Sequence, residues 1–195
     1  MTKKILLSLV FSCFTIVSFS QEVVKINTDA SSLIWTGSKL TSSHQGTINL
    51  KSGEIEIKDG TLVGGEFVID MTSIKNTDIE DEVYRTKLEK HLKADDFFGV
   101  EKHSEARLVI TKVIPSKTEG ENYQITADLT IKGITHSIRF LSDIKINNNA
   151  FLATSIIKFD RTKWDIKYNS ESFFDVGDKM ILDEVHLKLF LLSEK

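Results

Sequence analysis

The chain has 195 residues, of which 41% are hydrophobic and 27% are charged, and its formal net charge is −3. This length suits a single domain with a sizeable core. The negative charge argues against a nucleic-acid-binding protein, because such proteins carry a basic surface that meets the phosphate backbone. One proline, with no low-complexity stretch and no repeat of fixed period, argues against a linker, a second domain or a repeat array.

The first twenty residues have the layout of a secretory signal peptide. Lys3 and Lys4 form a basic start, and a largely apolar run follows them. Ser18 and Ser20 occupy the −3 and −1 positions of a small-residue cleavage site, so we expect an exported protein, periplasmic or secreted, that begins at Gln21. The apolar run is too short for a membrane span of about 20 residues. Charge interrupts the later apolar runs, so no transmembrane segment is expected.

Cys13 supports a competing interpretation, in which the chain is a lipoprotein. Ser12 suits the position before the modified cysteine, but Phe11 is bulky and Val10 replaces the usual leucine. If cleavage instead follows Ser20, the remaining 175 residues carry 23 basic and 28 acidic residues and no cysteine. Disulfides, a thiol nucleophile and a cysteine-based metal site are then excluded.

Most of the remaining chain alternates between apolar and polar residues. Such a period of two is typical of antiparallel sheet with one buried face, and glycine or asparagine turns separate the runs. Eight or nine short strands give either a sandwich or a closed barrel. Two of the short early runs can also form one bent strand. The predicted strands lie near 32–40, 45–51, 54–58, 61–71, 105–114, 122–132, 135–146, 150–159 and 180–192.

One amphipathic helix is predicted between the fourth and fifth of these runs. Thr77 and Glu80 form a capping box at its start. Acidic residues follow in the first turn and Lys90, His91 and Lys93 fill the last, which favours the helix dipole. A single helix of this kind usually covers an open end or edge of a sheet. Its apolar face comprises Ile79, Val83, Tyr84, Leu88 and Leu92.

Five short motifs occur in a characteristic order. They are WTGSK at 35–39 with HQG at 44–46, LEKHLKADDFF at 88–98, ADLTIKGIT at 127–135, FDRT at 159–162 and VGD at 176–178. In this order they resemble the YceI-like family, although His103-Ser104 stands where the family commonly has Tyr-Pro. The resemblance implies a lipocalin-like, eight-stranded antiparallel β-barrel in an exported bacterial protein. It also implies an elongated apolar cavity for a polyisoprenoid or another long-chain lipid.

The expected lipid site follows from this resemblance. A barrel of about eight strands can just enclose one ligand. Sequestering a lipid from water is worth about 0.8 kcal/mol per methylene before entropic costs. Alternation, bulk and family position together nominate eleven lining residues: Trp35, Ile48, Phe67, Ile69, Leu88, Phe97, Phe98, Leu129, Ile138, Phe140 and Phe159.

Two polar residues are candidates for contact with the lipid head group. His44 lies in the first motif and suits either the barrel mouth or a turn. Arg161 suits either a polar head or a structural role, in which it stacks on an aromatic ring such as Trp164 or closes one barrel end through a hydrogen-bonded pair. His91 is not nominated for such a contact, because a histidine in the last turn of a helix favourably opposes the helix dipole.

Motifs for catalysis and metal binding are not visible. The five histidines lack ligand spacing, no G-x-S-x-G occurs, and adjacent acid pairs such as Asp95-Asp96 tend to point apart. Gly64-Gly65 fits a bulge or a close backbone contact rather than a phosphate loop. We therefore expect a non-enzymatic protein without cofactor, and a homodimer is left open. The rival hypothesis is a structural or stress-response interaction protein whose barrel is filled by its own side chains.

Overall fold

Strands account for most of the chain in the computed structural model, which describes residues 21–147, 150–174 and 177–194. The predicted signal peptide, Cys13 and part of the last family motif lie outside the described residues, so the predicted cleavage after Ser20 stays a prediction. The elements are β1 (Gln21–Lys25), β2 (Ser32–Ser38), β3 (Ser43–Lys58), β4 (Thr61–Asn76), α1 (Glu82–Lys93), β5 (Glu105–Thr118), β6 (Glu121–Ile131), β7 (Ile134–Asn147), β8 (Ala150–Asp160), β9 (Glu184–Leu192) and two short 3-10 helices, η1 (Arg161–Trp164) and η2 (Gly177–Lys179).

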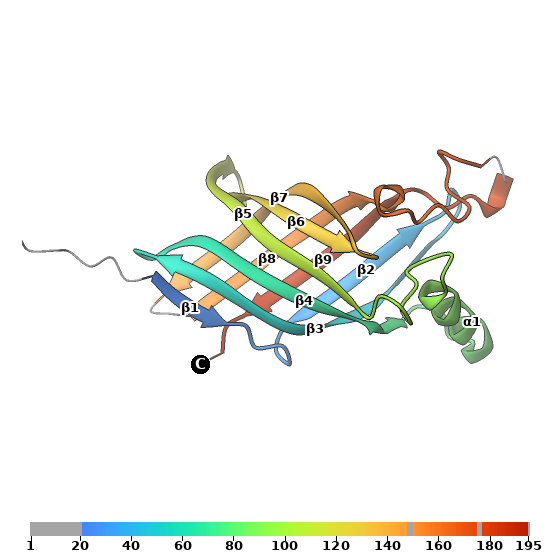
Figure 1. Ribbon diagram of the computed structural model, residues 1–195, viewed down its shortest axis with the longest axis horizontal. Helices are drawn as coiled ribbons and strands as arrows, with labels where there is room; N and C mark the ends of the chain where they lie inside the picture. Colours follow the sequence, from blue (N-terminus) through green and yellow to red (C-terminus); the bar gives the residue numbers. More distant parts are fainter. Residues whose placement is uncertain (1–20, 148–149, 175–176, 195) are drawn as a thin grey trace, which may run out of the picture.

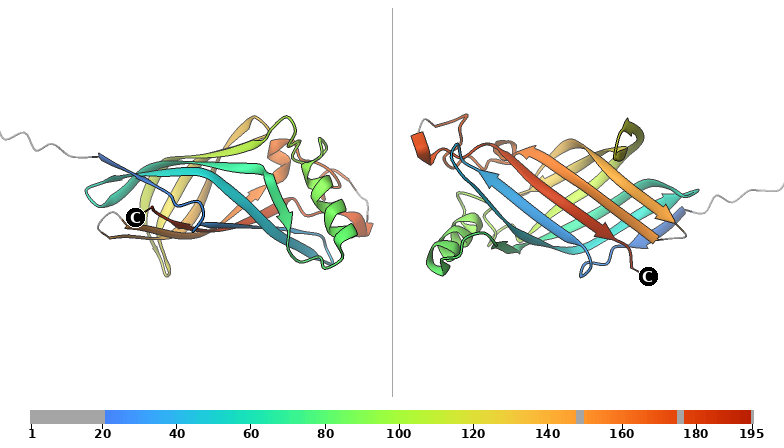
Figure 2. Two further views of the ribbon diagram at one scale, coloured as in Figure 1. Left: turned by 90° about the horizontal axis from the view of Figure 1, so that it is seen from below. Right: turned by 180° about the vertical axis from the view of Figure 1, so that it is seen from behind.

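The strands form a closed antiparallel barrel (Figures 1 and 2). From β2 to β9 each strand pairs with the next one in sequence, and β9 pairs with β2 to close the ring. β2 pairs with the first part of β3 and β1 pairs with its last part, so β1 and β2 share one position in the ring. The predicted eight-stranded antiparallel barrel is confirmed.

Several predicted strand boundaries change in the structure. The runs 45–51 and 54–58 form the single strand β3, whose register against β4 shifts between Leu50 and Ser52. β1 was not predicted. The last strand begins at Glu184 rather than near 180, because the carbonyl groups of Ile181 and Leu182 accept hydrogen bonds from Arg161.

The helix begins later than the sequence predicted. Its N-cap is Asp81, whose carboxylate accepts hydrogen bonds from the backbone of Val83 and Tyr84 at 2.8 and 3.1 Å. The predicted capping box is therefore wrong: the backbone N–H of Thr77 donates to Gln45 in β3. The predicted apolar face is also too long, because Val83 and Tyr84 are exposed and Leu92 is the one buried residue of the helix.

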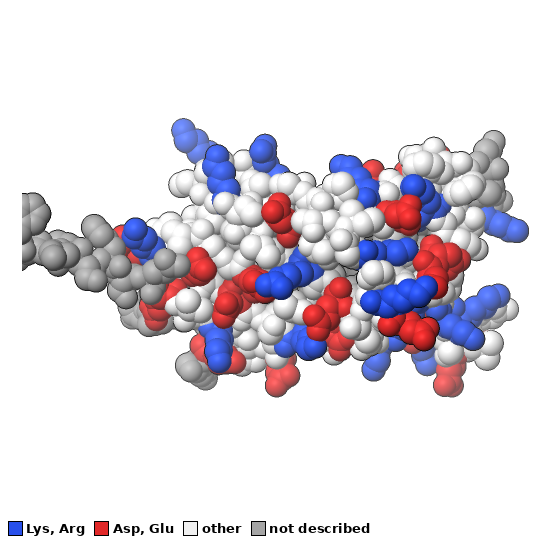
Figure 3. All heavy atoms as spheres, viewed as in Figure 1, with Lys and Arg blue, Asp and Glu red and all other residues white. Residues whose placement is uncertain are grey.

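Inward-facing apolar side chains from all parts of the ring form one buried cluster. Gly64 and Gly65 lie where β4 approaches β3 closely, since a Cβ on Gly65 would lie 2.8 Å from the Glu54 carbonyl oxygen. This confirms the predicted close contact. On the outer surface, acidic and basic side chains are intermixed (Figure 3). The barrel is elongated. At one end, which we call the helix end, α1 lies together with residues 161–174 and 177–182 (Figures 1 and 2), and we refer to these described residues as the segment 161–182.

Candidate functional site

A cavity with about 600 Å³ of space between atoms, including space open to solvent, occupies the barrel interior away from the helix end, and we call it the deep cavity. Ser142 supplies the one polar side chain among its described lining residues, and its hydroxyl donates to the Thr154 carbonyl at 3.0 Å. The lining therefore offers a ligand almost no free polar group. It consists of Leu33, Leu50, Ile55, Leu62, Phe67, Ile69, Leu108, Ile110, Ile125, Phe140, Ser142, Ile144, Phe151, Ala153, Ile157, Leu189 and Leu191.

A second cavity, with about 760 Å³ of space between atoms including space open to solvent, lies beneath α1, and we call it the helix-end cavity. Ile69 lines both cavities, so the two adjoin along the barrel. Arg161 supplies the one charged side chain among the described lining residues. The lining consists of Trp35, Gly37, Ile48, Ile69, Met71, Ile74, Leu92, Phe97, Phe98, Ala106, Leu129, Ile131, Phe159, Arg161, Ile181, Leu182, Val185 and Leu187.

The turn after α1 places two phenylalanines over this cavity. The backbone N–H groups of Phe98 and Val100 donate to Leu92 and Lys93, and Gly99 adopts φ +56°. Glycine tolerates this left-handed conformation, which reverses the chain at the end of the helix. Phe97 is buried, and its ring meets that of Phe98 edge-on at 5.1 Å. Both phenylalanines line the helix-end cavity, and their contact with a lipid stays a prediction.

Arg161 ties the segment 161–182 across the helix end. Its guanidinium is fully buried and donates to the carbonyl oxygens of Ile166 (2.8 Å), Ile181 (3.1 Å) and Leu182 (3.3 Å). It also lies 3.4 Å from the buried Asp183 carboxylate. Burial lowers the pKa of Arg161, and Asp183 opposes that shift. Arg161 thus joins one barrel end through hydrogen bonds, which is one of the two structural roles considered for this residue.

The aromatic partner of Arg161 differs from the one suggested. Its guanidinium lies 5.6 Å from the centroid of the Phe97 ring, not over Trp164. Trp164 is fully buried, its indole N–H donates to the Leu129 carbonyl at 3.1 Å, and its ring meets Phe159 edge-on. Both side chains therefore connect the segment 161–182 to the lining of the helix-end cavity. A contact between Arg161 and a lipid head group stays a prediction.

The first family motif has a direct structural role. The Trp35 indole N–H donates to the carbonyl oxygens of Thr47 and Lys75, at 3.3 and 3.1 Å, which fixes the ring across β3. A Cβ on Gly46 would lie 1.8 Å from the Lys75 carbonyl oxygen and 2.6 Å from the Trp35 ring. Glycine at this position thus lets the indole ring take its place in the wall of the helix-end cavity.

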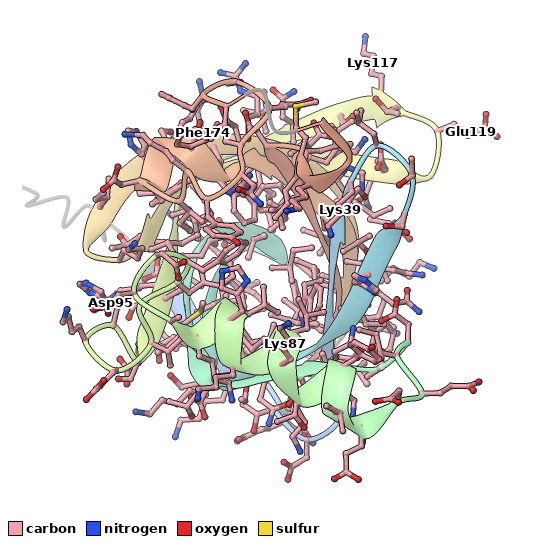
Figure 4. The ribbon with its side chains drawn as sticks, turned by 90° about the vertical axis from the view of Figure 1, so that its right-hand side faces the viewer. Lys39, Lys87, Asp95, Lys117, Glu119 and Phe174 are labelled. Carbon is pink, nitrogen blue, oxygen red and sulfur yellow. The ribbon has the colours of Figure 1, made fainter. Side chains whose placement is uncertain are left out.

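A wide groove of about 1500 Å³ opens at the helix end, and we call it the mouth groove. Ile181 lines both this groove and the helix-end cavity, so the groove adjoins the cavity. Figure 4 looks onto this end, with Lys87 on α1 and Lys39 beyond β2 on different sides of the barrel opening. The described lining residues are Lys39, His44, Ile79, Tyr84, Lys87, Leu88, His91, Asp96, Tyr168, Asn169, Lys179 and Ile181.

Two histidines of the groove have acidic neighbours. His44 Nδ1 lies 3.2 Å from Asp78, and His91 Nε2 lies 3.4 Å from Asp96. The pKa of Asp78 is lowered: burial works against the shift, but hydrogen bonds from Asn76, His44 and the Gln45 backbone outweigh it. His91 also packs against the rings of Phe97 and Tyr168. At the C-terminus of α1, His91 therefore packs between the helix and the segment 161–182.

Comparison with known proteins decides the family. The family model described as the YceI-like domain matches residues 24–191. The chain belongs to the YceI-like family. A UPF0312 protein of Photorhabdus laumondii is 44% identical over 50 residues, which is 26% of this chain and 24% of that protein. A UPF0312 protein of Pectobacterium carotovorum is 39% identical over 51 residues, or 26% of this chain and 25% of that protein. The chain thus aligns with about a quarter of the length of the curated relatives it matches.

Solved structures share the fold of this YceI-like chain. The crystal structure of Burkholderia cenocepacia BcnA has a TM-score of 0.68 at 17% identity, covering 87% of this chain and 99% of that one. The YCEI protein of Campylobacter jejuni has a TM-score of 0.52 at 15% identity, covering 100% of this chain and 99% of that one. At these identities the similarity concerns the fold alone.

The structure distributes the predicted lining residues of this YceI-like barrel over three places. Phe67, Ile69 and Phe140 line the deep cavity. Leu88 lines the mouth groove, and Ile138 packs against the core without lining either cavity. The helix-end cavity receives Trp35, Ile48, Ile69, Phe97, Phe98, Leu129 and Phe159.

Sequence reasoning missed most aliphatic lining residues of this YceI-like barrel. Leu33, Leu189 and Leu191 share the strand parity that selected other candidates, but the emphasis on bulky aromatic residues passed over them. Within the described residues, no group of three or more histidine, cysteine or acidic side chains could hold a metal ion. Among those residues, no helix has the length and apolar character needed to cross a membrane.

Proposed function

We propose that this protein is an exported carrier or store that holds one long-chain apolar lipid, an isoprenoid or a similar molecule, inside its barrel. The observation that carries the proposal is the pair of adjoining cavities with an almost wholly apolar lining. Both are concave and lined mainly by apolar side chains, as sites for apolar ligands usually are. The YceI-like family and the family resemblance of its motifs support a polyisoprenoid as the ligand class.

The physical basis of the proposed binding is burial of apolar surface. A lipid chain gains about 0.8 kcal/mol for each methylene removed from water, and the barrel wall needs no polar contact to provide this energy. The closed ring of strands, from β2 to β9, holds the lining in place before the ligand arrives, which limits the ordering cost of binding. We assign this site a binding role rather than a catalytic one.

The proposed binding mode gives each end of the lipid a place. The apolar tail occupies the deep cavity and passes Ile69 into the helix-end cavity. The head lies toward the mouth groove, where Leu88 and His44 are available. Arg161 lines the helix-end cavity near this path, although its donors already face protein acceptors.

Tryptophan fluorescence tests the proposal. Trp35 lines the helix-end cavity, whereas Trp164 is fully buried and is absent from the described lining of both cavities. Titration of the delipidated protein with a long-chain prenol should change the emission of Trp35 and saturate at one prenol per barrel. The Trp35→Phe variant should lose most of this signal while still retaining prenol during gel filtration. Wild-type protein that takes up no prenol would contradict the proposal and favour a barrel filled by its own side chains.

A further inference from the structure

Large exposed apolar side chains gather at the helix end. We call six of them the mouth rim: Leu40, Val83, Tyr84, Tyr168, Phe173 and Phe174, of which Val83 is 76% and Phe174 49% exposed. They come from the turn after β2, from α1 and from the segment 161–182. The four other large apolar side chains described as exposed, Val23, Val63, Ile114 and Ile156, lie on four different strands. A concentration of this kind marks an interaction site more often than scattered single residues do.

Local structure holds these side chains outward. Asp81 caps α1 and so places Val83 and Tyr84 in the first turn, ahead of the buried Leu92. In the segment 161–182, the N–H groups of Phe173 and Phe174 both donate to the Ser170 carbonyl, at 3.2 and 3.0 Å. Ser170 is fully buried, so this turn is anchored while its two phenylalanines remain exposed. Figure 4 shows Phe174 at the helix end.

The mouth rim borders the route into the barrel. Tyr84 and Tyr168 belong both to the rim and to the lining of the mouth groove. Through Ile181 the groove adjoins the helix-end cavity. An apolar molecule leaving the cavity would therefore meet the rim side chains next. A surface placed against the rim would cover the route from the cavity.

Positive charge accompanies these apolar residues. Lys39, Lys87 and Lys179 line the mouth groove, where Asp96 is the one acidic residue among the described lining. Neither Lys39 nor Lys87 forms an ion pair with another residue of the described ranges. Lys167 lies 5.2 Å from the centroid of the Phe173 ring. Aromatic and aliphatic side chains beside lysines are the composition that binds at the interface of an anionic bilayer.

We propose that the mouth rim docks this barrel onto an anionic lipid bilayer, with the rim side chains in the interface and the groove lysines against lipid phosphates. The inference rests on the proposed function, because a carrier of an apolar lipid must collect or deliver that lipid at a membrane. A bilayer fits the rim better than one rigid partner does, because the side chains come from three segments around an opening rather than from one flat face. Docking would place the mouth groove directly over the lipid phase.

Vesicle flotation tests the docking surface. The wild-type protein should bind vesicles of phosphatidylcholine and phosphatidylglycerol more tightly than vesicles of phosphatidylcholine alone. Replacing three rim residues that do not line the mouth groove, Leu40→Ser, Val83→Ser and Phe174→Ser, should weaken binding to the mixed vesicles by about tenfold or more. Lys39→Gln with Lys87→Gln should lower only the preference for the anionic vesicles, by about thirtyfold, since each lysine near such a surface is worth about 1 kcal/mol.

Matched controls come from exposed residues elsewhere on the barrel. Val23→Ser with Ile156→Ser removes exposed apolar side chains from two strands, and Lys117→Gln removes a charge from the end of β5, so both should bind vesicles as the wild type does. Equal losses in the control and rim variants would overturn the proposal. So would a wild-type protein that binds no anionic vesicles, or one whose rim instead mediates self-association in gel filtration.

The prenol titration separates this inference from the proposed function. Rim variants that still take up prenol from solution but no longer float with vesicles support the docking surface. Wild-type protein that takes up prenol and ignores vesicles overturns the docking surface alone. Wild-type protein that takes up no prenol overturns the proposed function.

Discussion

The middle of the barrel and its helix end are built by different kinds of interaction. In the middle, strands that are neighbours in sequence pair in order, and alternating side chains line the deep cavity. At the helix end, a few buried polar groups connect segments that no ladder joins, above all Arg161 with its carbonyl acceptors. The comparison teaches that many equivalent apolar side chains form the cavity walls, whereas a few specific side chains close the helix end.

The largest expected effect is therefore at Arg161. Arg161→Leu removes the guanidinium donor from the Ile166 carbonyl, and it leaves the Ile181 carbonyl and the buried Asp183 carboxylate with only their backbone donors. We expect this change to lower the free energy of unfolding by about 3–5 kcal/mol. Urea denaturation measures this loss. Arg139→Leu, at an exposed position on β7, is the control and should change stability by about 0.5 kcal/mol or less. Equal stability of the two variants would contradict the closure role.

A charged side chain inside the barrel should abolish lipid retention. Leu129 lines the helix-end cavity, and Leu129→Asp places an unpaired carboxylate among apolar side chains at a cost of several kcal/mol unless water enters. We expect a barrel that still shows sheet by circular dichroism but retains no lipid on extraction. The control is Thr126→Asp, on the opposite face of β6, where Asp128 already shows that a carboxylate is tolerated. A Leu129→Asp protein with normal lipid content would show that this position does not face the ligand.

Substitution of two isoleucines compares the stability cost of a cavity in the cavity wall with that in the packed core. Ile57 is buried and absent from the described lining of either cavity, whereas Ile69 is equally buried and lines both. Ile57→Ala should cost about 2–5 kcal/mol with or without lipid. In delipidated protein Ile69→Ala should cost less, because part of the Ile69 side chain already faces empty space. Thermal unfolding with and without added prenol measures both, and equal costs in delipidated protein would indicate a solid core around Ile69.

The smallest expected effect concerns pH. The pKa of Asp78 is lowered in the fold, so its contribution to stability is present above its unfolded pKa of about 3.9 and disappears as pH falls through its folded pKa. Asp78→Asn should flatten the fall of stability with pH below about pH 5, mostly by removing the interactions with His44 and Asn76. Urea midpoints measured across this range test the effect. An unchanged slope would show that other carboxylates dominate.

Much of the fold could be predicted from the sequence because local alternation dictates it. The ladder from β5 to β8 follows period-two runs with turns between them, and its boundaries agree closely with the prediction. The start of α1 was predicted too early because Thr77-x-x-Glu80 is as good a local cap as Asp81. Only the contact of Thr77 with Gln45 in β3 decides between them. That contact is distant in sequence, so no local pattern reports it.

The candidate site also contains residues that could be predicted from the sequence and residues that could not. Strand parity and family motifs identified Trp35, Phe67 and Leu129 as lining residues, and each faces a cavity. The ring partner of Arg161 was not predicted, because Phe97 reaches it from the turn after α1 and not from the neighbouring sequence. The side of a strand on which a residue lies could be predicted from its own segment, whereas contacts between segments required the structure.

The central claim is that a lipid, and not only protein side chains, fills the barrel interior. Native mass spectrometry of the purified mature protein, followed by organic extraction and a second measurement, tests it most directly. We predict a mass excess that corresponds to one long-chain apolar lipid per barrel, that disappears on extraction and is restored by added prenol, and that is missing from folded Leu129→Asp protein. A wild-type protein that carries no excess mass and takes up none when offered prenol would contradict the account.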